Sequence, residues 1–234
     1  MSVTLLVDGN ALSYVVPVMK YNTKEEYMKQ YFNKLRDYAK NFTAMVKVVV
    51  FFDDKIGGTW RDEIYPEYQK DRKASKQNKT SDEETESLKR AEYLNYIKDC
   101  FNNSKYSYVS YPHTESDDLI ALYCKNLQQD KETIVILTTD KDLLQLISED
   151  SNRKVQVYSL TKHKIYKSEK EGKQALEDKI MLGDASDSIP SVCYGVGKTY
   201  YPDFKQYLQV MKDNNVDPTD EEKAKKICES LNIK

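Results

Sequence analysis

The chain has few of the side chains that build soft metal sites or nucleophilic centres. Its 234 residues include two histidines and four cysteines, and the cysteines are scattered without a C-x-x-C pair. This spacing predicts buried, reduced thiols rather than a zinc site. We do not expect His113 or His163 to be catalytic, so a bound metal should use oxygen ligands.

The chain also lacks long apolar runs and a strong net charge. No segment approaches the roughly 20 apolar residues of a transmembrane helix, and the start "MSVTLLVDGN" has no basic region typical of a signal peptide. We therefore expect a cytosolic protein without a membrane partner. The formal net charge is −2, so only local clusters of charge can indicate a polyanionic partner.

Apolar residues follow strand-like and helix-like periods in alternation. The predicted strands are Val3–Val7, the stretch "MVKVVVFFDD" that ends near Asp53, Tyr106–Val109 and Glu132–Leu137, with a hairpin from Val155–Tyr158 and Lys164–Tyr166. The main predicted helices are Lys24–Phe42, Glu84–Phe101 and Lys173–Leu182. The alternation predicts an α/β fold with a mostly parallel sheet, and ligands bind such sheets at the carboxyl ends of the strands.

Acidic residues follow three of the predicted strands directly. More acids come from "ESDDL", which opens a predicted helix, from the start of the helix expected after Asp140, and from the loop "GDASD". The full set is Asp8, Asp53, Glu115, Asp117, Asp118, Asp140, Asp142, Asp184 and Asp187. A single such acid is usually a turn former or a helix cap. Their coincidence at one sheet edge predicts a cation site, because so many carboxylates cannot share a cleft uncompensated.

Hard divalent ions suit this set of ligands. Mg²⁺ prefers oxygen ligands and keeps several of its waters. Two such ions about 4 Å apart can activate a water and stabilise the leaving oxygen of a phosphodiester. The acids therefore predict two-metal phosphodiester hydrolysis.

Six motifs in order resemble the signatures of the 5′-nuclease family. They are "LLVDGNALSY", "VVVFFDD", "WRDEIYPEYQKDR", "TESDDLIAL", "ILTTDKDLLQL" and "GDASDSIPSVCYGVGKT". This family includes bacteriophage 5′→3′ exonucleases, flap endonucleases and the 5′-nuclease domain of bacterial DNA polymerase I. The resemblance implies a PIN-like core over residues 1–170, with a helical arch at about 60–100, and a helix–hairpin–helix lobe over 171–234.

The resemblance also implies the roles of the acids. One metal cluster would be Asp8, Asp53, Glu115 and Asp117, and the other Asp140, Asp142, Asp184 and Asp187, with Asp117 or Asp118 shared between them. Two Mg²⁺ ions are implied, with Mn²⁺ as a substitute. The implied activity is cleavage near the 5′ end of branched, nicked or RNA-primed DNA during replication, by a monomer in the cytoplasm of a bacterium or a phage-infected host, together with replication proteins.

Basic and glycine-rich segments would bind the nucleic acid in this family. Lys70 and Arg72 would act at the base of the arch, and the basic run continues with Lys73 and Lys76. Tyr68 would either stack on a base or pack in the core, and we favour the core. The hairpin would grip a duplex backbone, and a monovalent cation, through Gly195, Gly197, Lys198 and Thr199.

Three positions depart from the family pattern. Val15 stands where a basic residue is common, Gln69 stands where a lysine follows the tyrosine, and the hairpin spacing differs by a residue on either side of the glycines. Two other functions are open: a PIN-type ribonuclease, and a non-catalytic module that binds DNA junctions. A Rossmann cofactor enzyme is excluded because no G-x-G-x-x-G follows the first strand.

Overall fold

The protein consists of two compact units in the computed structural model. Described are residues 3–42, 46–77, 80–126, 133–150, 153–191, 201–216, 222, 223 and 226. The first unit is Met1–Glu177 and the second is Asp178–Lys234. We describe each unit by itself.

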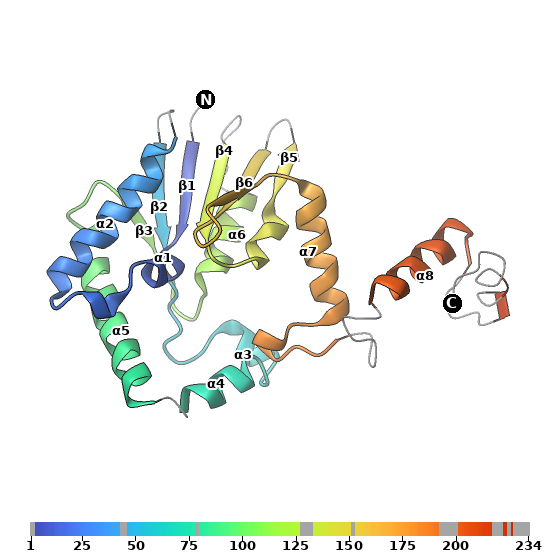
Figure 1. Cartoon of the computed structure of the whole chain (residues 1–234), viewed down its shortest axis with the longest axis horizontal. Coiled ribbons are helices and arrows are strands. Elements are labelled where there is room, and N and C mark those ends of the chain that lie inside the picture. The colour runs from blue at the N-terminus through green and yellow to red at the C-terminus, as the bar shows by residue number, and fades with distance from the viewer. Residues whose placement is uncertain are drawn as a thin grey trace. The chain divides into compact units, whose positions relative to one another are not determined.

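A mixed sheet forms the centre of the first unit (Figure 1). Its strands in the described residues are β1 (Val3–Asp8), β2 (Val46–Phe51), β3 (Ser107–Val109), β4 (Thr133–Thr138), β5 (Ser148–Asp150), β6 (Arg153–Ser159) and β7 (Lys164–Tyr166). The order is β3-β2-β1-β4-β6-β5, and β7 also pairs with β6. Strands β3, β2, β1, β4 and β6 pair in parallel, while β5 and β7 run antiparallel to β6. The mostly parallel sheet and the β6–β7 hairpin are confirmed, whereas β5 was not predicted.

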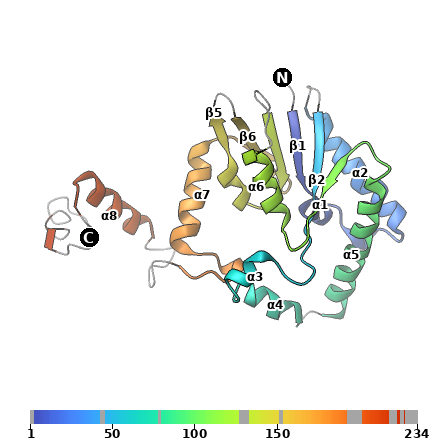
Figure 2. The same ribbon diagram turned by 180° about the vertical axis from the view of Figure 1, so that it is seen from behind.

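Helices cover both faces of this sheet (Figure 1 and Figure 2). On one face lie α1 (Gly9–Val15), α2 (Lys24–Lys40) and α5 (Ser81–Phe101), and on the other lies α6 (Ser116–Asn126). An apolar core lies on each face of the sheet. Leu5 and Val7 of β1 pack in the core beneath α1, α2 and α5, which we call the first core. Leu6 packs in the second core, together with Ile120 of α6. Tyrosines at helical spacing on α2, such as Tyr27 and Tyr31, are fully buried in the first core. The rigid sheet therefore fixes where each strand end lies.

Two short helices lie in the segment between β2 and α5. They are α3 (Trp60–Ile64) and α4 (Lys70–Gln77). Helix α5 begins at Ser81, earlier than the predicted Glu84, because Thr80 and Glu83 form a capping box. After Asp140 the predicted helix is a short 3-10 helix, η2 (Asp142–Leu146). Another short 3-10 helix, η1 (Val18–Lys20), precedes α2.

The second unit is helical where it is described. Helix α7 (Glu169–Leu182) leads into it, and η3 (Ala185–Asp187) and α8 (Tyr201–Asp213) follow. The predicted hairpin residues Gly195, Gly197, Lys198 and Thr199 lie outside the described residues, so the helix–hairpin–helix assignment stays a prediction. No helix in the described part of the chain is long and apolar enough to cross a membrane.

Gly9 allows α1 to begin directly against the end of β2. A Cβ at Gly9 would lie 2.4 Å from Cε1 of Phe52 and 2.9 Å from the carbonyl oxygen of Phe51. Both distances are shorter than atoms tolerate, and one of the atoms is backbone. The absence of a side chain at Gly9 therefore brings the acids that follow β1 and β2 close together.

We expect Gly9→Ala to lower the free energy of unfolding by roughly 1–3 kcal/mol, because the new methyl group overpacks this contact. Urea unfolding monitored by circular dichroism measures the change. Asn10→Ala, in the same turn of α1, is the control and should stay close to wild type. Equal stability of Gly9→Ala and wild type would show that the contact relaxes freely.

Candidate metal centre

Asp8 lies at the end of β1 and is almost fully buried. Its Oδ1 accepts a hydrogen bond from the Ala11 amide at 2.9 Å, and its Oδ2 accepts one from the Thr138 hydroxyl at 3.0 Å. Burial, together with the charges of Asp53 and Asp140, raises the pKa of Asp8 to about 6 despite these hydrogen bonds. The raised pKa indicates that this carboxylate lacks compensating positive charge.

Asp53 follows β2 and meets the start of α6. Its Oδ1 accepts a hydrogen bond from the Ser116 amide at 2.8 Å. The Ser116 hydroxyl lies 3.4 Å from Oδ1 of Asp8. The first residue of α6 therefore contacts both acids, which brings β1, β2 and α6 together at one point.

Three acids cluster around the start of α6. Glu115, Asp117 and Asp118 each offer a carboxylate oxygen, and these oxygens lie within 4.8 Å of one another. Burial and the neighbouring charge of Glu115 raise the pKa of Asp117 to about 7. The two most strongly raised carboxyl pKa values of the described residues thus belong to Asp8 and Asp117, both at this edge of the sheet.

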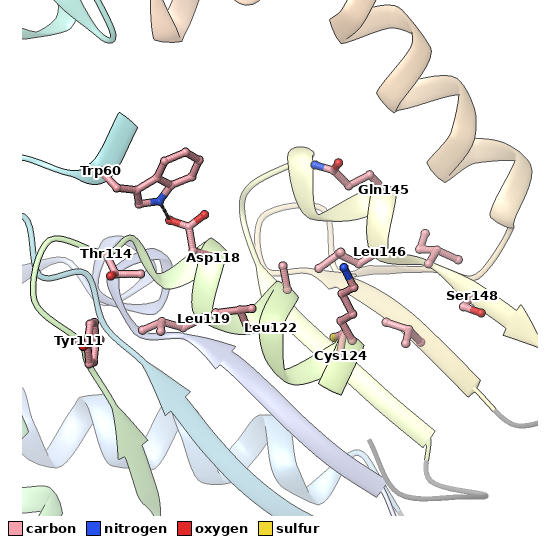
Figure 3. A pocket seen from close by; sticks show the side chains of 14 residues that line it. Trp60, Tyr111, Thr114, Asp118, Leu119, Leu122, Cys124, Gln145, Leu146 and Ser148 are labelled. Atoms are coloured by element: carbon pink, nitrogen blue, oxygen red, sulfur yellow. Dashed lines mark hydrogen bonds between the residues drawn. The ribbon is translucent and has the colours of Figure 1, made fainter. Parts of the chain in front are cut away.

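Arg61 in α3 compensates part of this negative charge. Its two terminal nitrogens lie 2.7 and 2.8 Å from the two oxygens of Asp118, and Nη1 lies 3.0 Å from Oε2 of Glu115. Trp60 Nε1 also donates to Asp118 at 3.0 Å, as Figure 3 shows. Both oxygens of Asp118 are therefore engaged, and its role as a shared metal ligand stays a prediction. The pocket drawn in Figure 3 is lined largely by apolar side chains such as Leu119 and Leu122, so it is not where the acids converge.

Lys55 is the second cation at the cluster. Its Nζ lies 3.2 Å from Oδ2 of Asp53 and forms a close ion pair with Oε1 of Glu115. Burial alone would lower the pKa of Lys55, but the two carboxylates outweigh it and raise the pKa. The Lys55 ammonium group therefore contacts both Asp53, which follows β2, and Glu115, which precedes α6.

Asp140 and Asp142 lie just beyond β4. The Asp142 amide donates to Oδ1 of Asp140 at 2.8 Å, and the Asp140 amide donates to the Thr138 hydroxyl at 3.0 Å. Because Thr138 also contacts Asp8, its hydroxyl connects the two strand ends. The structure thus brings Asp140 beside the first set of acids.

Asp184 and Asp187 belong to the second unit. Asp184 caps η3, accepts a hydrogen bond from the Ser186 amide at 2.9 Å and forms a close ion pair with Lys179. Burial raises the pKa of Asp184, but the bonds from Lys179 and Ser186 outweigh it and lower the pKa. The membership of Asp184 and Asp187 in a metal cluster stays a prediction.

The basic run lies in α4. Lys70, Arg72 and Lys73 are exposed; Lys70 pairs with Glu67 at 3.2 Å and Lys73 pairs with Asp62. Lys76 lies in α4 as well. None of these contacts reaches the carboxylate cluster.

Tyr68 lies just before α4, beside the acids at the start of α6. It is buried in the core, and its hydroxyl donates to Oε2 of Glu115 at 2.9 Å. The neighbouring Gln69 is also buried and donates to the Tyr68 hydroxyl at 3.1 Å. Contact of Tyr68 with a base stays a prediction.

Four polar residues of the site were not predicted from the sequence: Lys55, Arg61, Ser116 and Thr138. Each lies inside or next to a quoted motif, and Thr138 is a polar residue at the end of a buried strand. That position is the one signal that could have identified Thr138 as a contact of Asp8.

The chemistry of these groups fits divalent ions. Asp8, Asp53, Glu115 and Asp117 supply only carboxylate oxygens, which hard cations prefer. The raised pKa values of Asp8 and Asp117 show that an added positive charge would be stabilising. The fold and the site therefore define an α/β protein that can bind metal ions through acids at the carboxyl ends of its parallel strands.

Comparison with known proteins assigns the family. Residues 3–179 match the sequence model of the 5′-3′ exonuclease N-terminal resolvase-like domain. Because this match covers most of the chain, the chain belongs to that family. The resemblance found in the sequence motifs is confirmed.

Curated relatives extend beyond the region of similarity. The chain is 29% identical over 245 residues to DNA polymerase I of Bacillus subtilis, covering 97% of this chain and 26% of the relative. It is 29% identical over 203 residues to a 5′-3′ exonuclease of Mycoplasmopsis pulmonis, covering 83% and 63%. The chain thus spans about a quarter of the first relative and less than two thirds of the second.

Solved structures confirm the fold. The T5 D15 flap endonuclease, determined with DNA and metal ions, superposes with a TM-score of 0.67 at 21% identity, covering 88% of this chain and 75% of that one. Human GEN1 in complex with Holliday junction DNA superposes with a TM-score of 0.53 at 16% identity, covering 96% and 56%.

We expect Arg61→Met to lower the free energy of unfolding of the metal-free protein by about 2 kcal/mol, because Glu115 and Asp118 lose a charged hydrogen-bond donor. Mg²⁺ should restore part of the loss by replacing the missing charge. Urea unfolding in EDTA and in Mg²⁺ measures both effects. Arg36→Met, an exposed arginine of α2 bonded to Asn33, is the control. A loss of equal size in both buffers would contradict this role of Arg61.

Proposed function

We propose that this protein is a metal-dependent, structure-specific 5′-nuclease. The observation that carries the proposal is the meeting of Asp8, Asp53 and Glu115 at one sheet edge in a chain of the 5′-3′ exonuclease family. The substrate would be DNA with a free 5′ strand, in branched, nicked or RNA-primed form. A relative named flap endonuclease, from Escherichia phage T5, is 24% identical to this chain over 203 residues, which supports this substrate class.

Two divalent ions, Mg²⁺ with Mn²⁺ as a substitute, would supply the Lewis acid chemistry when bound. We assign Asp8, Asp53, Glu115 and Asp117 to one cluster. The motif order supports a second cluster, made of Asp140, Asp142, Asp184 and Asp187. Held by these acids, the ions would supply the positive charge that activates a water and stabilises the leaving oxygen of a phosphodiester.

The chain's own residues would orient these ligands. The Ser116 amide and the Thr138 hydroxyl hold Asp53 and Asp8 in one orientation through their hydrogen bonds. Arg61 and Tyr68 do the same for Glu115. This preorganisation matters because small displacements of metal ligands are costly to catalysis.

The exposed cations of α4 would engage the single-stranded 5′ end. Arg72 lines a hollow with Tyr14 and Arg90, between α4 and the helices α1 and α5. Lys70, Lys73 and Lys76 continue along the same short helix. Such cations bind phosphates without regard to sequence.

The residues Gly195, Gly197, Lys198 and Thr199 would contact the duplex and a monovalent cation. Monomeric action in the cytoplasm, alongside replication proteins, completes the proposal.

Cleavage of a 5′-labelled flap duplex and a nicked RNA-primed duplex tests the proposal. We expect products near the 5′ end with Mg²⁺ and none with EDTA. Asp140→Asn should reduce cleavage by at least about 100-fold, because a ligand charge is lost at the metal centre, while flap binding stays near wild type. The control is Asp37→Asn, an exposed acid of α2.

The outcomes separate the alternatives. Product lengths distinguish exonucleolytic trimming from cleavage at the flap junction. Tight binding of both duplexes without cleavage would instead favour a module that binds DNA junctions. Preferred cleavage of single-stranded RNA would favour a PIN-type ribonuclease.

We expect the double substitution Lys70→Gln and Arg72→Gln to weaken binding of a 5′-flap duplex by about tenfold at low salt, because two phosphate contacts are lost. Binding of a blunt duplex without a flap should change much less. Fluorescence anisotropy at two salt concentrations measures both. Unchanged flap binding would show that α4 is an ordinary solvated surface.

A further inference from the structure

Lys55 has a position that the proposed ligand roles leave unexplained. Its ammonium group contacts Asp53 and Glu115, which we propose as ligands of one metal ion. An ammonium group and a divalent ion cannot both occupy the space between these two carboxylates. Lys55 therefore holds one oxygen of each of two acids that we assign to the same metal ion.

The backbone of Lys55 is held in place. Asp54 and Thr114 exchange two backbone hydrogen bonds, each of 3.0 Å. The Gly58 amide donates to the carbonyl of Lys55 at 3.0 Å, and the turn uses Gly57 at a φ of 82° and Gly58 at 99°. Such φ values favour glycine, so Gly57 and Gly58 allow the chain to make this turn. These backbone hydrogen bonds anchor the chain around Lys55, and its flexible four-carbon stem carries the ammonium group at the site.

Lys55 and Arg61 differ in how firmly their side chains are held against the acids. Arg61 is held by both oxygens of Asp118 and by Glu115, in a planar, two-pronged contact. Lys55 is a point charge on a flexible stem with about a third of its side chain exposed. Of the two, Lys55 is the side chain that can leave.

We propose that Lys55 is a phosphate-binding residue whose ammonium group rests on Asp53 and Glu115 until these carboxylates hold a divalent ion. It then contacts a non-bridging oxygen of the phosphodiester, the nearest negative charge that arrives with the substrate. This inference rests on the proposed nuclease function. No bond is made or broken by Lys55, which supplies only a positive charge near the charge that develops on the phosphate.

Lys55→Gln tests the proposal by two readouts. Without a competing ammonium group, the DNA-free protein should bind Mn²⁺ about tenfold more tightly by isothermal titration calorimetry. At saturating metal, kcat on the flap duplex should fall by at least about tenfold, because the phosphate contact is lost. Lys55→Arg, which keeps the charge, should retain more of kcat than Lys55→Gln and serves as a second variant. Lys40→Gln, an exposed lysine of α2 paired with Asp37, is the matched control.

Both readouts are needed to support the proposal. Unchanged metal affinity in Lys55→Gln would overturn the competition, and an unchanged kcat at saturating metal would overturn the phosphate contact. Wild-type protein that neither binds Mn²⁺ nor cleaves DNA would contradict the nuclease function itself. If the wild-type protein binds Mn²⁺ and cleaves DNA, and Lys55→Gln has the same Mn²⁺ affinity and the same kcat, only the role of Lys55 is contradicted.

Discussion

Repulsion among buried carboxylates is the constraint on which this structure depends. Asp8 and Asp53 end neighbouring parallel strands, and the three acids at the start of α6 are directed to the same edge. A fold can hold such charges together only if hydrogen bonds, cations or raised pKa values compensate them. All three occur here, in the Ser116 and Thr138 bonds, in Lys55 and Arg61, and in the raised pKa values of Asp8 and Asp117.

The scaffold supplies the rigidity that this arrangement requires. Two apolar cores pack on opposite faces of the sheet, and residues of β1 alternate between them. A one-residue shift of β1 would place its apolar side chains in the wrong cores, so its register is strongly specified. The position of Asp8 at the strand end follows from that register. The buried interior therefore determines where the charged groups lie, and Gly9 permits the closest approach.

The cations of the first unit fall into two groups with different physical roles. Lys55 and Arg61 lie against acids at the strand ends, where burial strengthens each charge pair. Lys70, Arg72 and Lys73 lie exposed on α4, where salt screens them strongly. Lys55 and Arg61 can therefore neutralise the acids of the metal centre directly. The second group suits the reversible, salt-dependent contacts that proteins make with a nucleic acid backbone.

Much of the fold and many of the acids could be predicted from the sequence, because strands and helices follow local periodicity. The apolar runs predicted β1, β2 and β4, and the polar residues that follow them predicted one acidic sheet edge. Ordered motifs identified the family, which the match over residues 3–179 confirms. Local patterns were weaker for short elements such as β5, α3 and η2, whose few residues carry little periodic signal.

The sequence by itself determined the α/β class, the family and which strands end in acids, since each depends on neighbouring residues. Only the tertiary structure decided which cations meet those acids. Arg61 and Asp118 are 57 positions apart, and Thr138 and Asp8 are 130 positions apart. No local rule relates such residues. Their contacts arise because parallel strands from distant segments end at one edge, where buried charge selects the few polar side chains within reach.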